Sequence, residues 1–389
     1  MITSTTTSTM KSKDTYEVVV IGGGIIGCAC AASLAKAGLK VLIIEPSTIG
    51  GGTTAAGMGH LVVMDDNAAE LALSSYSLEL WRALITEDQR EAARHEYMQC
   101  GTIWVAADDE EMEAARAKLQ ILQAHDIACE MLNAEQLRQR EPQLRTGLAG
   151  GLLVKQDALV YPPKSAQILL ELALAHGATL HRQSAIDLLD DGTHRGVKCA
   201  DGSEIFAQHI VVANGIASTQ LVNDLPLRHK KGHLVITDRY PNFIQHQLVE
   251  LGYIKSAHAS DGDSVAFNLQ PRPTGQVFIG SSRQFDVTHK EIDTGILSKM
   301  LAQATSYVPA LADLKAIRTW TGFRAATPDG LPYIGPHPTI QKLWMATGHE
   351  GLGITTSLAT AEILKDQICQ QVSKIAVEPY WPSRAAGQH

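Results

Sequence analysis

The sequence predicts an α/β protein in which a discontinuous parallel-sheet domain is combined with an α+β domain whose sheet is mainly antiparallel. Three observations predict this fold. A strand, a glycine turn, a helix and a second strand follow one another over residues 17–45. Another buried strand is expected at residues 209–213, and strand-like runs joined by Gly, Pro and Asp turns occupy residues 226–320. At 389 residues the chain is long enough for two domains.

Composition narrows the class of function. The 33 Lys and Arg residues against 41 Asp and Glu give a formal net charge of −8, and no block of basic residues suggests a nucleic-acid partner. Hydrophobic residues make up 45% and charged residues 19%, which is a globular composition. The six cysteines form no CxxC pair, so we expect small buried thiols in a reducing compartment and no bound metal.

The strongest motif lies near the start of the chain. A β-branched run, Glu17–Ile21, is followed at once by GxGxxG, and a helix of small residues and a second strand ending in Glu45 come next. The motif glycines are Gly22, Gly24 and Gly27. The first permits a tight turn, the second lets the backbone approach a pyrophosphate, and the third brings helix and strand together. Glu45 is placed to accept hydrogen bonds from a ribose, so the sequence predicts a Rossmann-like dinucleotide-binding domain.

The same segment imitates a signal peptide, because residues 18–35 carry no charge and two lysines precede them. Acidic residues directly before the run and four glycines inside it favour a buried strand, turn and helix instead. Residues 1–13 are expected to be a disordered leader. We expect a cytoplasmic protein, with peripheral contact at the inner face of a membrane as an alternative.

A glycine-dense stretch follows the ribose-binding strand. Nine of the eleven residues in 50–60 are Gly, Ala or Thr, which suits a flat ring system packed against backbone and favours a flavin over a nicotinamide. A flexible surface loop is the alternative. The residues proposed to pass the ring are Thr53, Thr54, Gly57, Met58, Gly59 and His60.

The remaining pattern gives the domain division. Helices are expected over residues 67–85, 109–125, 133–142, 164–176 and 355–371, and short strands at 204–206 and 209–213. The FAD-binding domain is expected to comprise residues 14–90, 143–225 and 320–389. The substrate-binding domain is expected to comprise residues 91–142 and 226–319.

Two features near the C-terminus complete the candidate site. Arg324 stands beside a Gly- and Pro-rich turn and is suited to hold a small carboxylate in a bidentate pair; a structural arginine is the alternative. Gly351 and Gly353 precede a helix whose first N–H groups and positive dipole end would stabilise an anionic reduced ring.

Together these segments resemble the D-amino-acid-oxidase superfamily of FAD-dependent amine oxidoreductases, which includes glycine oxidase, D-amino-acid dehydrogenase, the sarcosine oxidase β-subunit and D-proline or D-hydroxyproline dehydrogenases. The resemblance rests on residues 22–45, 53–60, 141–142, 211–215, 322–335 and 349–355. It implies non-covalent FAD and Arg324 on the substrate carboxylate. The cofactor-binding residues it implies, beyond those already named, are Ile186, Asn214, Gly215, Gly322, Gly351, Leu352, Gly353, Ile354 and Thr355.

The resemblance also implies hydride transfer from the carbon bearing nitrogen to flavin N5, which leaves an imine. His60 is the candidate for tuning the amine proton, and Tyr253 the candidate for covering the site; a loop histidine and a core tyrosine are the alternatives. The run His349–Thr355 resembles dehydrogenases of secondary amino acids more than the classical D-amino-acid oxidases, so D-proline or D-hydroxyproline is the preferred substrate. A glycine/sarcosine or general D-amino-acid oxidase, and a flavin subunit of a multi-chain amine dehydrogenase, are the alternatives. The electron acceptor (oxygen, quinone or carrier) and the oligomeric state stay open.

Overall fold

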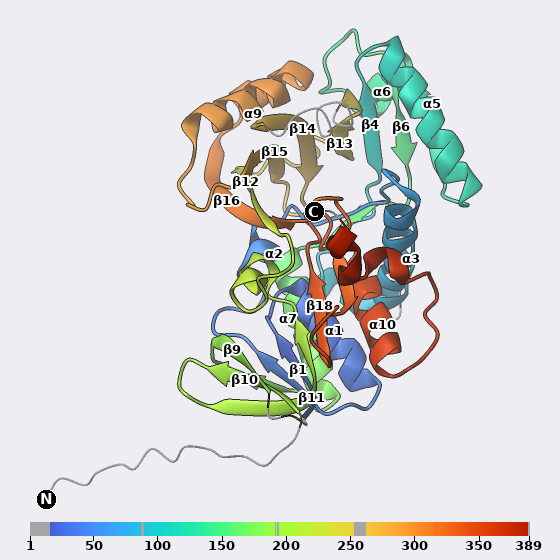
Figure 1. Ribbon diagram of the computed structural model, residues 1–389. Coiled ribbons are helices and arrows are strands. Elements are labelled where there is room, and N and C mark those ends of the chain that lie inside the picture. The colour runs from blue at the N-terminus through green and yellow to red at the C-terminus, as the bar shows by residue number, and fades with distance from the viewer. Residues whose placement is uncertain (1–15, 87–88, 191, 193, 253–261, 388–389) are drawn as a thin grey trace, which may run out of the picture.

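Two sheets, one in each half of the molecule, organise the fold (Figure 1). The structure is a computed structural model that describes residues 16–86, 89–190, 192, 194–252 and 262–387. The expected leader at residues 1–13 and the candidate residue Tyr253 lie outside the described residues. The predicted combination of a Rossmann-like domain and a second domain with a mainly antiparallel sheet is confirmed.

The first sheet has the strand order β17-β18-β11-β1-β2-β8, and β10 and β9 extend it beside β11. Its strands are β1 (Tyr16–Ile21), β2 (Val41–Ile44), β8 (Thr179–His181), β9 (Ala185–Asp190), β10 (Arg195–Cys199), β11 (Glu204–Val212), β17 (Tyr333–Pro336) and β18 (Leu343–Thr347). β1 pairs in parallel with both β2 and β11, as the buried Val and Ile runs predict. The two short strands expected at 204–206 and 209–213 are one strand, β11, because its ladder with β1 continues through Ala207 and His209.

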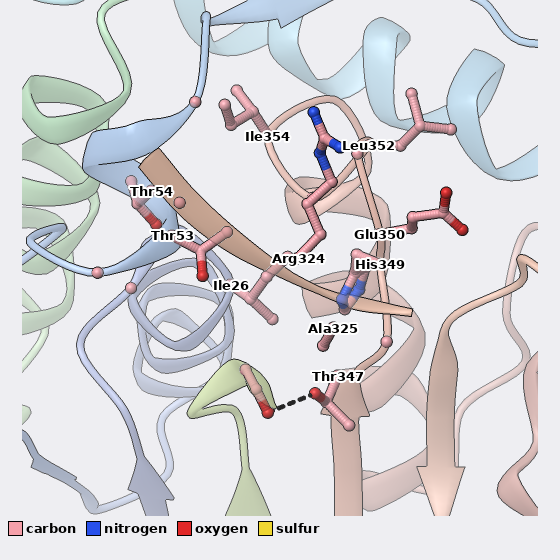
Figure 2. Close-up of a pocket in the computed structure, with 18 of the residues that line it drawn as sticks. Ile26, Thr53, Thr54, Arg324, Ala325, Thr347, His349, Glu350, Leu352 and Ile354 are labelled. Atoms are coloured by element: carbon pink, nitrogen blue, oxygen red, sulfur yellow. Dashed lines mark hydrogen bonds between the residues drawn. The ribbon is translucent and has the colours of Figure 1, made fainter. Parts of the chain in front are cut away.

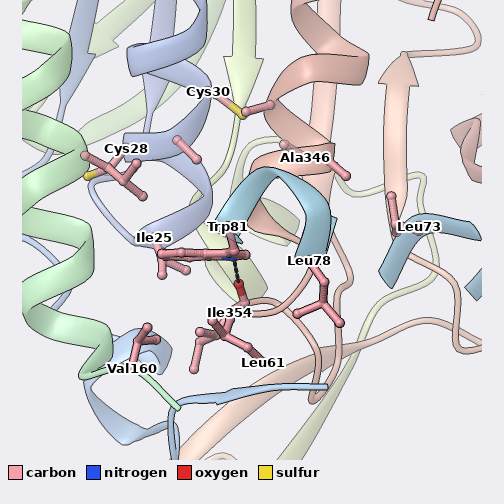
Figure 3. Packing of buried hydrophobic residues seen from close by; sticks show 14 of the residues in the cluster. Ile25, Cys28, Cys30, Leu61, Leu73, Leu78, Trp81, Val160, Ala346 and Ile354 are labelled. Atoms are coloured by element: carbon pink, nitrogen blue, oxygen red, sulfur yellow. Dashed lines mark hydrogen bonds between the residues drawn. The ribbon is translucent and has the colours of Figure 1, made fainter. Parts of the chain in front are cut away.

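Helices pack on both sheets and on one another. They are α1 (Ile25–Lys36), α2 (Thr53–Ala56), α3 (Ala68–Thr86), α4 (Gln89–Arg94), α5 (Asp109–Ala124), α6 (Ala134–Arg140), α7 (Pro162–Ala175), α9 (Thr294–Tyr307) and α10 (Ser357–Ile368). α1 packs closely against α7 and α10 because its buried face consists mainly of Ala, Cys and Gly. The core beneath α3 contains the fully buried Trp81, which belongs to one hydrophobic cluster with Ile25, Leu61 and Leu78 (Figure 3).

The second sheet has the order β16-β12-β15-β14-β13-β4-β6-β5. Its strands are β4 (Thr102–Ala106), β5 (Cys129–Asn133), β6 (Gly150–Val154), β12 (Arg228–Thr237), β13 (Gln247–Glu250), β14 (Ser264–Pro271), β15 (Val277–Phe285) and β16 (Ala316–Ala326). All of its pairs are antiparallel except β13 with β4. β6 and the end of β16 fall inside segments expected to belong to the FAD-binding domain, yet both strands are built into this sheet. The reason is pairing: β6 lies between β4 and β5, and β16 follows β12 from Arg228 to Thr237.

Two smaller features complete the fold. β3 (His60–Leu61) and β7 (Ala158–Leu159) form a two-stranded sheet at the end of the glycine-dense stretch. Helix α9 was not predicted from the sequence, although its signals are present: Asp293 caps it by accepting from the N–H groups of Gly295 and Ile296. Its buried face recurs at helical spacing through Ile296, Met300, Ala304 and Tyr307.

The uncharged segment at residues 18–35 forms β1 and α1, as predicted. Within the described part of the chain, no helix combines the length and the apolar character needed to cross a bilayer. The six cysteines are all free thiols, and Cys28, Cys30 and Cys199 are buried. Burial raises the pKa of Cys28 to about 12, so this thiol stays protonated and inert at neutral pH.

Candidate active site

One large cavity runs between the two sheets, from the GxGxxG turn to the strands β12–β16, and has a volume of about 1240 Å³. A drug-sized ligand typically occupies roughly 300–1,000 Å³, so this space suits a dinucleotide together with a small molecule. Seventeen of the predicted site residues line it: Gly22, Gly24, Glu45, Thr53, Thr54, Gly57, Met58, His60, Ile186, Asn214, Gly215, Gly322, Arg324, Gly351, Leu352, Gly353 and Ile354. Segments that are far apart in the sequence are thus brought to one site.

Three predicted residues, Gly27, Gly59 and Thr355, stand behind the wall of the cavity. A Cβ on Gly27 would lie 2.0 Å from the Gly22 carbonyl oxygen, so only glycine lets α1 pack on the turn. Gly59 has a φ of +99°, and a Cβ there would lie 2.1 Å from the Val160 carbonyl oxygen. The Thr355 hydroxyl donates to the His60 carbonyl at 3.0 Å. These residues shape the site through packing and do not face its contents.

At the GxGxxG end, the backbone itself forms the wall. Gly22 has a φ of +113°, and a Cβ there would lie 2.7 Å from the Ala213 carbonyl oxygen. Helix α1 begins with no side-chain cap at Gly24, and the Ile25 N–H donates to the Thr54 hydroxyl at 3.0 Å. The start of α1 therefore presents backbone N–H groups and a positive dipole end to the cavity, which suits a pyrophosphate.

Glu45 stands at the end of β2 with a fixed carboxylate. One oxygen accepts from the Gly23 N–H at 2.7 Å and the other from the Ser47 N–H at 2.8 Å. Each oxygen keeps a further lone pair for a ribose hydroxyl. Asn214 lines the same end, and its buried Oδ1 has no hydrogen-bond partner among the described residues. Unpaired buried acceptors are costly, so this atom indicates a bound donor.

The glycine-dense stretch at residues 50–60 contacts residues 322–354, from the C-terminal part of the chain, at the middle of the cavity (Figure 2). A Cβ on Gly57 would lie 2.7 Å from Ile354 Cδ1, and a Cβ on Gly322 would lie 2.3 Å from Ala56 Cβ. The Thr53 hydroxyl donates to the Phe323 carbonyl at 2.7 Å and ties α2 to β16. These contacts leave a slot walled by small residues and backbone, and the residues present therefore fit a flavin dinucleotide.

Hydrogen bonds and an ion pair to neighbouring elements fix the loop at residues 349–355, which precedes α10. The Trp81 indole N–H donates to the Ile354 carbonyl at 3.2 Å (Figure 3). His349 bonds to the Thr360 hydroxyl at 3.0 Å, and burial lowers the pKa of this histidine to about 3, so the ring is neutral. Glu350 pairs with Lys230, whose own pKa is lowered by burial. The Gly351–Thr355 backbone is thereby fixed before any ligand binds.

Arg324 extends from β16 toward the loop that carries Leu352 and Ile354 (Figure 2). Its Nη1 donates to the Ser282 carbonyl at 3.1 Å, which orients the guanidinium across the neighbouring strand β12. This path is open because residue 232 is glycine: a Cβ there would lie 2.8 Å from Arg324 Nη2. A guanidinium has five N–H donors in a planar fork, a geometry that can bind a carboxylate in the cavity with two parallel hydrogen bonds.

His60 lines the cavity with both ring nitrogens in hydrogen bonds. Nε2 lies 3.2 Å from the Gly351 carbonyl oxygen, which only accepts, so Nε2 carries the proton. Nδ1 then accepts from the Gln270 amide at 3.1 Å. Burial is the main cause that lowers the pKa of His60 to about 4, and the charge of Arg324 adds to it. The ring is therefore neutral at pH 7 and fixed in one tautomer.

Sequence reasoning missed several polar residues on the second sheet that line or support the cavity. They are Trp104, Lys230, Gln247, Asn268, Gln270 and Arg283. The Gln270 amide that reaches His60 also donates to Gln247 Oε1 at 3.1 Å, and the Gln247 amide donates to the Ala158 carbonyl at 3.1 Å. The alternation of side chains along β13 and β14 was the sequence signal that could have found them, because every second residue of a strand lies on the same face of the sheet. It does not say which face borders the cavity.

The chain is similar in sequence and in fold to known amino acid oxidoreductases. Glycine oxidase of Bacillus subtilis is 28% identical over 364 residues, which cover 91% of this chain and 93% of that protein. The crystal structure of glycine oxidase from Geobacillus kaustophilus matches with a TM-score of 0.84 and 25% identity, covering 95% of this chain and 98% of that one. L-Proline dehydrogenase from P. horikoshii shares the fold with a TM-score of 0.87 at 24% identity, over 96% of this chain and 99% of that one.

The family model described as DAO, FAD dependent oxidoreductase, matches residues 17–367, which include both sheets and every described candidate residue. The glycine turn, the Glu45 carboxylate and the small-residue slot fit the cofactor of that family. The predicted resemblance and the predicted FAD cofactor are thus confirmed. The chain belongs to the DAO family and is an FAD-dependent oxidoreductase.

Proposed function

We propose that the protein oxidises the C–N bond of a small D- or cyclic secondary amino acid to the imine, with D-proline or D-hydroxyproline as the preferred substrate. The observation that carries the proposal is Arg324. Its guanidinium is fixed by Ser282 and faces a cavity whose opposite part fits a flavin dinucleotide. A bidentate carboxylate pair at this position would hold the α-carbon of an amino acid beside the ring slot.

Bound FAD supplies a hydride acceptor, and we propose that it is held without a covalent bond. The chain's own residues supply orientation and a fixed environment. Arg324 fixes the substrate carboxylate, and the preorganised loop Gly351–Ile354 places backbone groups at the ring slot. Substrate loses a hydride from carbon and a proton from nitrogen, which leaves a C=N bond; a primary imine is then hydrolysed by water.

The state of His60 supports a substrate amine that enters uncharged. With a pKa of about 4 and with Nδ1 engaged by Gln270, this histidine does not take a proton at neutral pH. We therefore propose His60 as a positioning residue that joins β3 to the Gly351 carbonyl. The ammonium proton is lost to solvent before the amine binds, and the N–H proton is lost to solvent only after the hydride has left the carbon.

The preference for a ring rests on the run His349–Thr355, which resembles that of secondary amino acid dehydrogenases. A second candidate is glycine or sarcosine oxidation, which the likeness to Bacillus subtilis glycine oxidase favours. The two differ in the size of the group on the α-carbon, so they are separable by substrate alone.

The test is the purified holoenzyme with a dye acceptor and with oxygen, against glycine, sarcosine, D-alanine, D-proline and 4-hydroxy-D-proline. We expect the highest kcat/KM for the two ring substrates. A preference for glycine or sarcosine supports the second candidate, and no turnover of any amino acid contradicts both. Size-exclusion chromatography of the same sample tests the remaining alternative: full dye-reducing activity in a peak of this chain alone excludes an obligatory partner subunit.

A further inference from the structure

One row of residues crosses the cavity face of the second sheet. Trp104 on β4 pairs with Val249 on β13, Val249 pairs with Asn268 on β14, and Asn268 pairs with Gly280 on β15. Trp104, Val249 and Asn268 all line the cavity. The GxGxxG turn follows β1 in the first sheet, whereas this row lies in the sheet that carries Arg324, so we assign the row to the substrate side.

Two members of this row carry buried polar atoms without a hydrogen-bond partner among the described residues. They are Trp104 Nε1, in a side chain that is 3% exposed, and Asn268 Oδ1. A buried donor or acceptor that is left unpaired costs stability, so native proteins rarely keep one without a reason. Indole Nε1 can only donate, whereas the amide oxygen can only accept. One donor and one acceptor are the complement of a hydroxyl group, which accepts one bond and donates another.

The position of Asn268 relative to Arg324 suits a small substrate. The Arg324 guanidinium lies at the Ser282 carbonyl on β15, and Gly280, the partner of Asn268, is two positions away on that strand. With strands about 4.8 Å apart and a rise of about 3.3 Å per residue, Ser282 and Asn268 lie on the order of 8 Å apart. This separation between the two backbone positions leaves room for a small molecule whose carboxylate faces Arg324 and whose other end faces Asn268.

The same strand keeps the row in place. Gln270, two residues beyond Asn268 on the same face of β14, is fully buried and bonded to both His60 and Gln247. On the other side of the row, the Lys118 ammonium lies 4.3 Å from the centre of the Trp104 ring and pairs with Asp65. Trp104 thus packs against a fixed cation, and Asn268 lies on a strand that the hydrogen bonds of Gln270 hold in place, which favours the rigidity that selective recognition requires.

We propose that Trp104 and Asn268 form a hydroxyl-binding subsite, so that the substrate class is a ring amino acid with a hydroxyl opposite its carboxylate. This inference rests on the proposed function, because it takes Arg324 to hold the carboxylate. A site built to bond a hydroxyl disfavours the analogue that lacks it, since its own polar atoms then stay buried and unpaired.

The experiment compares kcat/KM for D-proline and for both epimers of 4-hydroxy-D-proline in the wild type, Trp104→Phe and Asn268→Leu. The first variant keeps the ring and removes the N–H, and the second keeps the side-chain shape and removes the acceptor. Trp320→Phe is the matched control, because Trp320 Nε1 is also buried without a partner among the described residues but does not line the cavity. Flavin content and melting temperature of each variant show that the holoenzyme is intact.

We expect the wild type to favour one hydroxylated epimer over D-proline by about tenfold, as one or two hydrogen bonds would give. Both variants should lower this ratio to near one, and the control should leave it unchanged. If D-proline is oxidised but neither epimer is favoured, or if the ratio survives in both variants, the subsite is wrong and the proposed function stands. If no ring substrate is oxidised while glycine is, the proposed function fails and the subsite fails with it.

Discussion

The two ends of the cavity are built in different ways. The cofactor end consists of backbone: glycines at positions 22, 27 and 57 bring chain segments into contact, and N–H groups rather than long side chains face the space. The other end, which we propose holds the substrate and call the substrate end, consists of side chains on six strands of one sheet, with Arg324, Asn268 and Trp104 among them. The cofactor end therefore depends on where side chains are missing, and the substrate end depends on which side chains are present.

This difference predicts that changes at one end leave the other intact. A side chain added at the cofactor end should prevent FAD binding whatever the substrate. A side chain removed at the substrate end should impair turnover of a protein that still carries its flavin. Each of the following changes tests that separation, and they are ordered by the size of the expected effect.

Gly27→Val should have the largest effect. Its Cβ would lie 2.0 Å from the Gly22 carbonyl oxygen, so α1 must move away from the turn, and the purified variant should retain almost no flavin. Visible absorbance per protein and the FAD Kd measure this. Gly52→Ala is the control, because no atom lies within 4 Å of a Cβ built there and the backbone is not in the left-handed region. A yellow Gly27→Val protein with wild-type FAD affinity would contradict the claim that close packing of α1 on the glycine turn forms the FAD site.

Arg324→Ala should have the next largest effect: we expect turnover to be impaired while FAD binding is retained. Two charge-assisted hydrogen bonds to a carboxylate are worth about 1.5–3 kcal/mol each, so kcat/KM should fall roughly 100-fold or more while flavin content is unchanged. Arg318→Ala, an exposed arginine on the same strand, should behave as the wild type. Equal losses in both variants would point to damage of β16 and not to a lost carboxylate partner.

His60→Gln should reveal itself in the dependence of stability on pH. The pKa of His60 is lowered from 6.5 to about 4, so below pH 6.5 the unfolded chain binds a proton that the folded chain does not. The unfolding free energy of the wild type should therefore fall as the pH drops from 6.5 toward 4. Its slope against pH should exceed that of the variant by the contribution of up to one bound proton. His95 and His349 shift in the same direction and titrate in both proteins. Denaturant melts at several pH values measure the difference, and parallel curves would show that His60 titrates normally.

Thr53→Val should have the smallest effect of the series. It removes the bond from the Thr53 hydroxyl to the Phe323 carbonyl, which joins the two ends of the cavity. A neutral hydrogen bond is worth about 0.5–1.5 kcal/mol, so we expect a change of about 2- to 10-fold divided between FAD affinity and kcat/KM. Thr53→Ser should restore both values. A variant indistinguishable from the wild type would mean that other contacts set the distance between α2 and β16.

The contrast between the two ends also explains what the sequence could predict. Nearly all residues predicted to bind the cofactor line the cavity, because GxGxxG, Glu45 and the glycine-dense stretch are local patterns whose spacing follows from backbone geometry. Arg324 was predicted because of its neighbouring turn and the family resemblance. Trp104, Asn268 and Gln270 were not, since strand pairing between residues more than a hundred positions apart brings them together. The place of β6 in the second sheet was missed for the same reason: pairing, not local pattern, decides it.

The proposed reaction depends above all on a carboxylate held by Arg324 beside the flavin. Anaerobic reduction of the purified flavoprotein by D-proline and by pyrrolidine, the same ring without the carboxylate, tests this most directly. We predict that D-proline bleaches the flavin rapidly and that pyrrolidine does so at least 100-fold more slowly, a difference that Arg324→Ala should largely remove. Equal bleaching by the two amines in the wild type, or no bleaching by any amino acid, would contradict it.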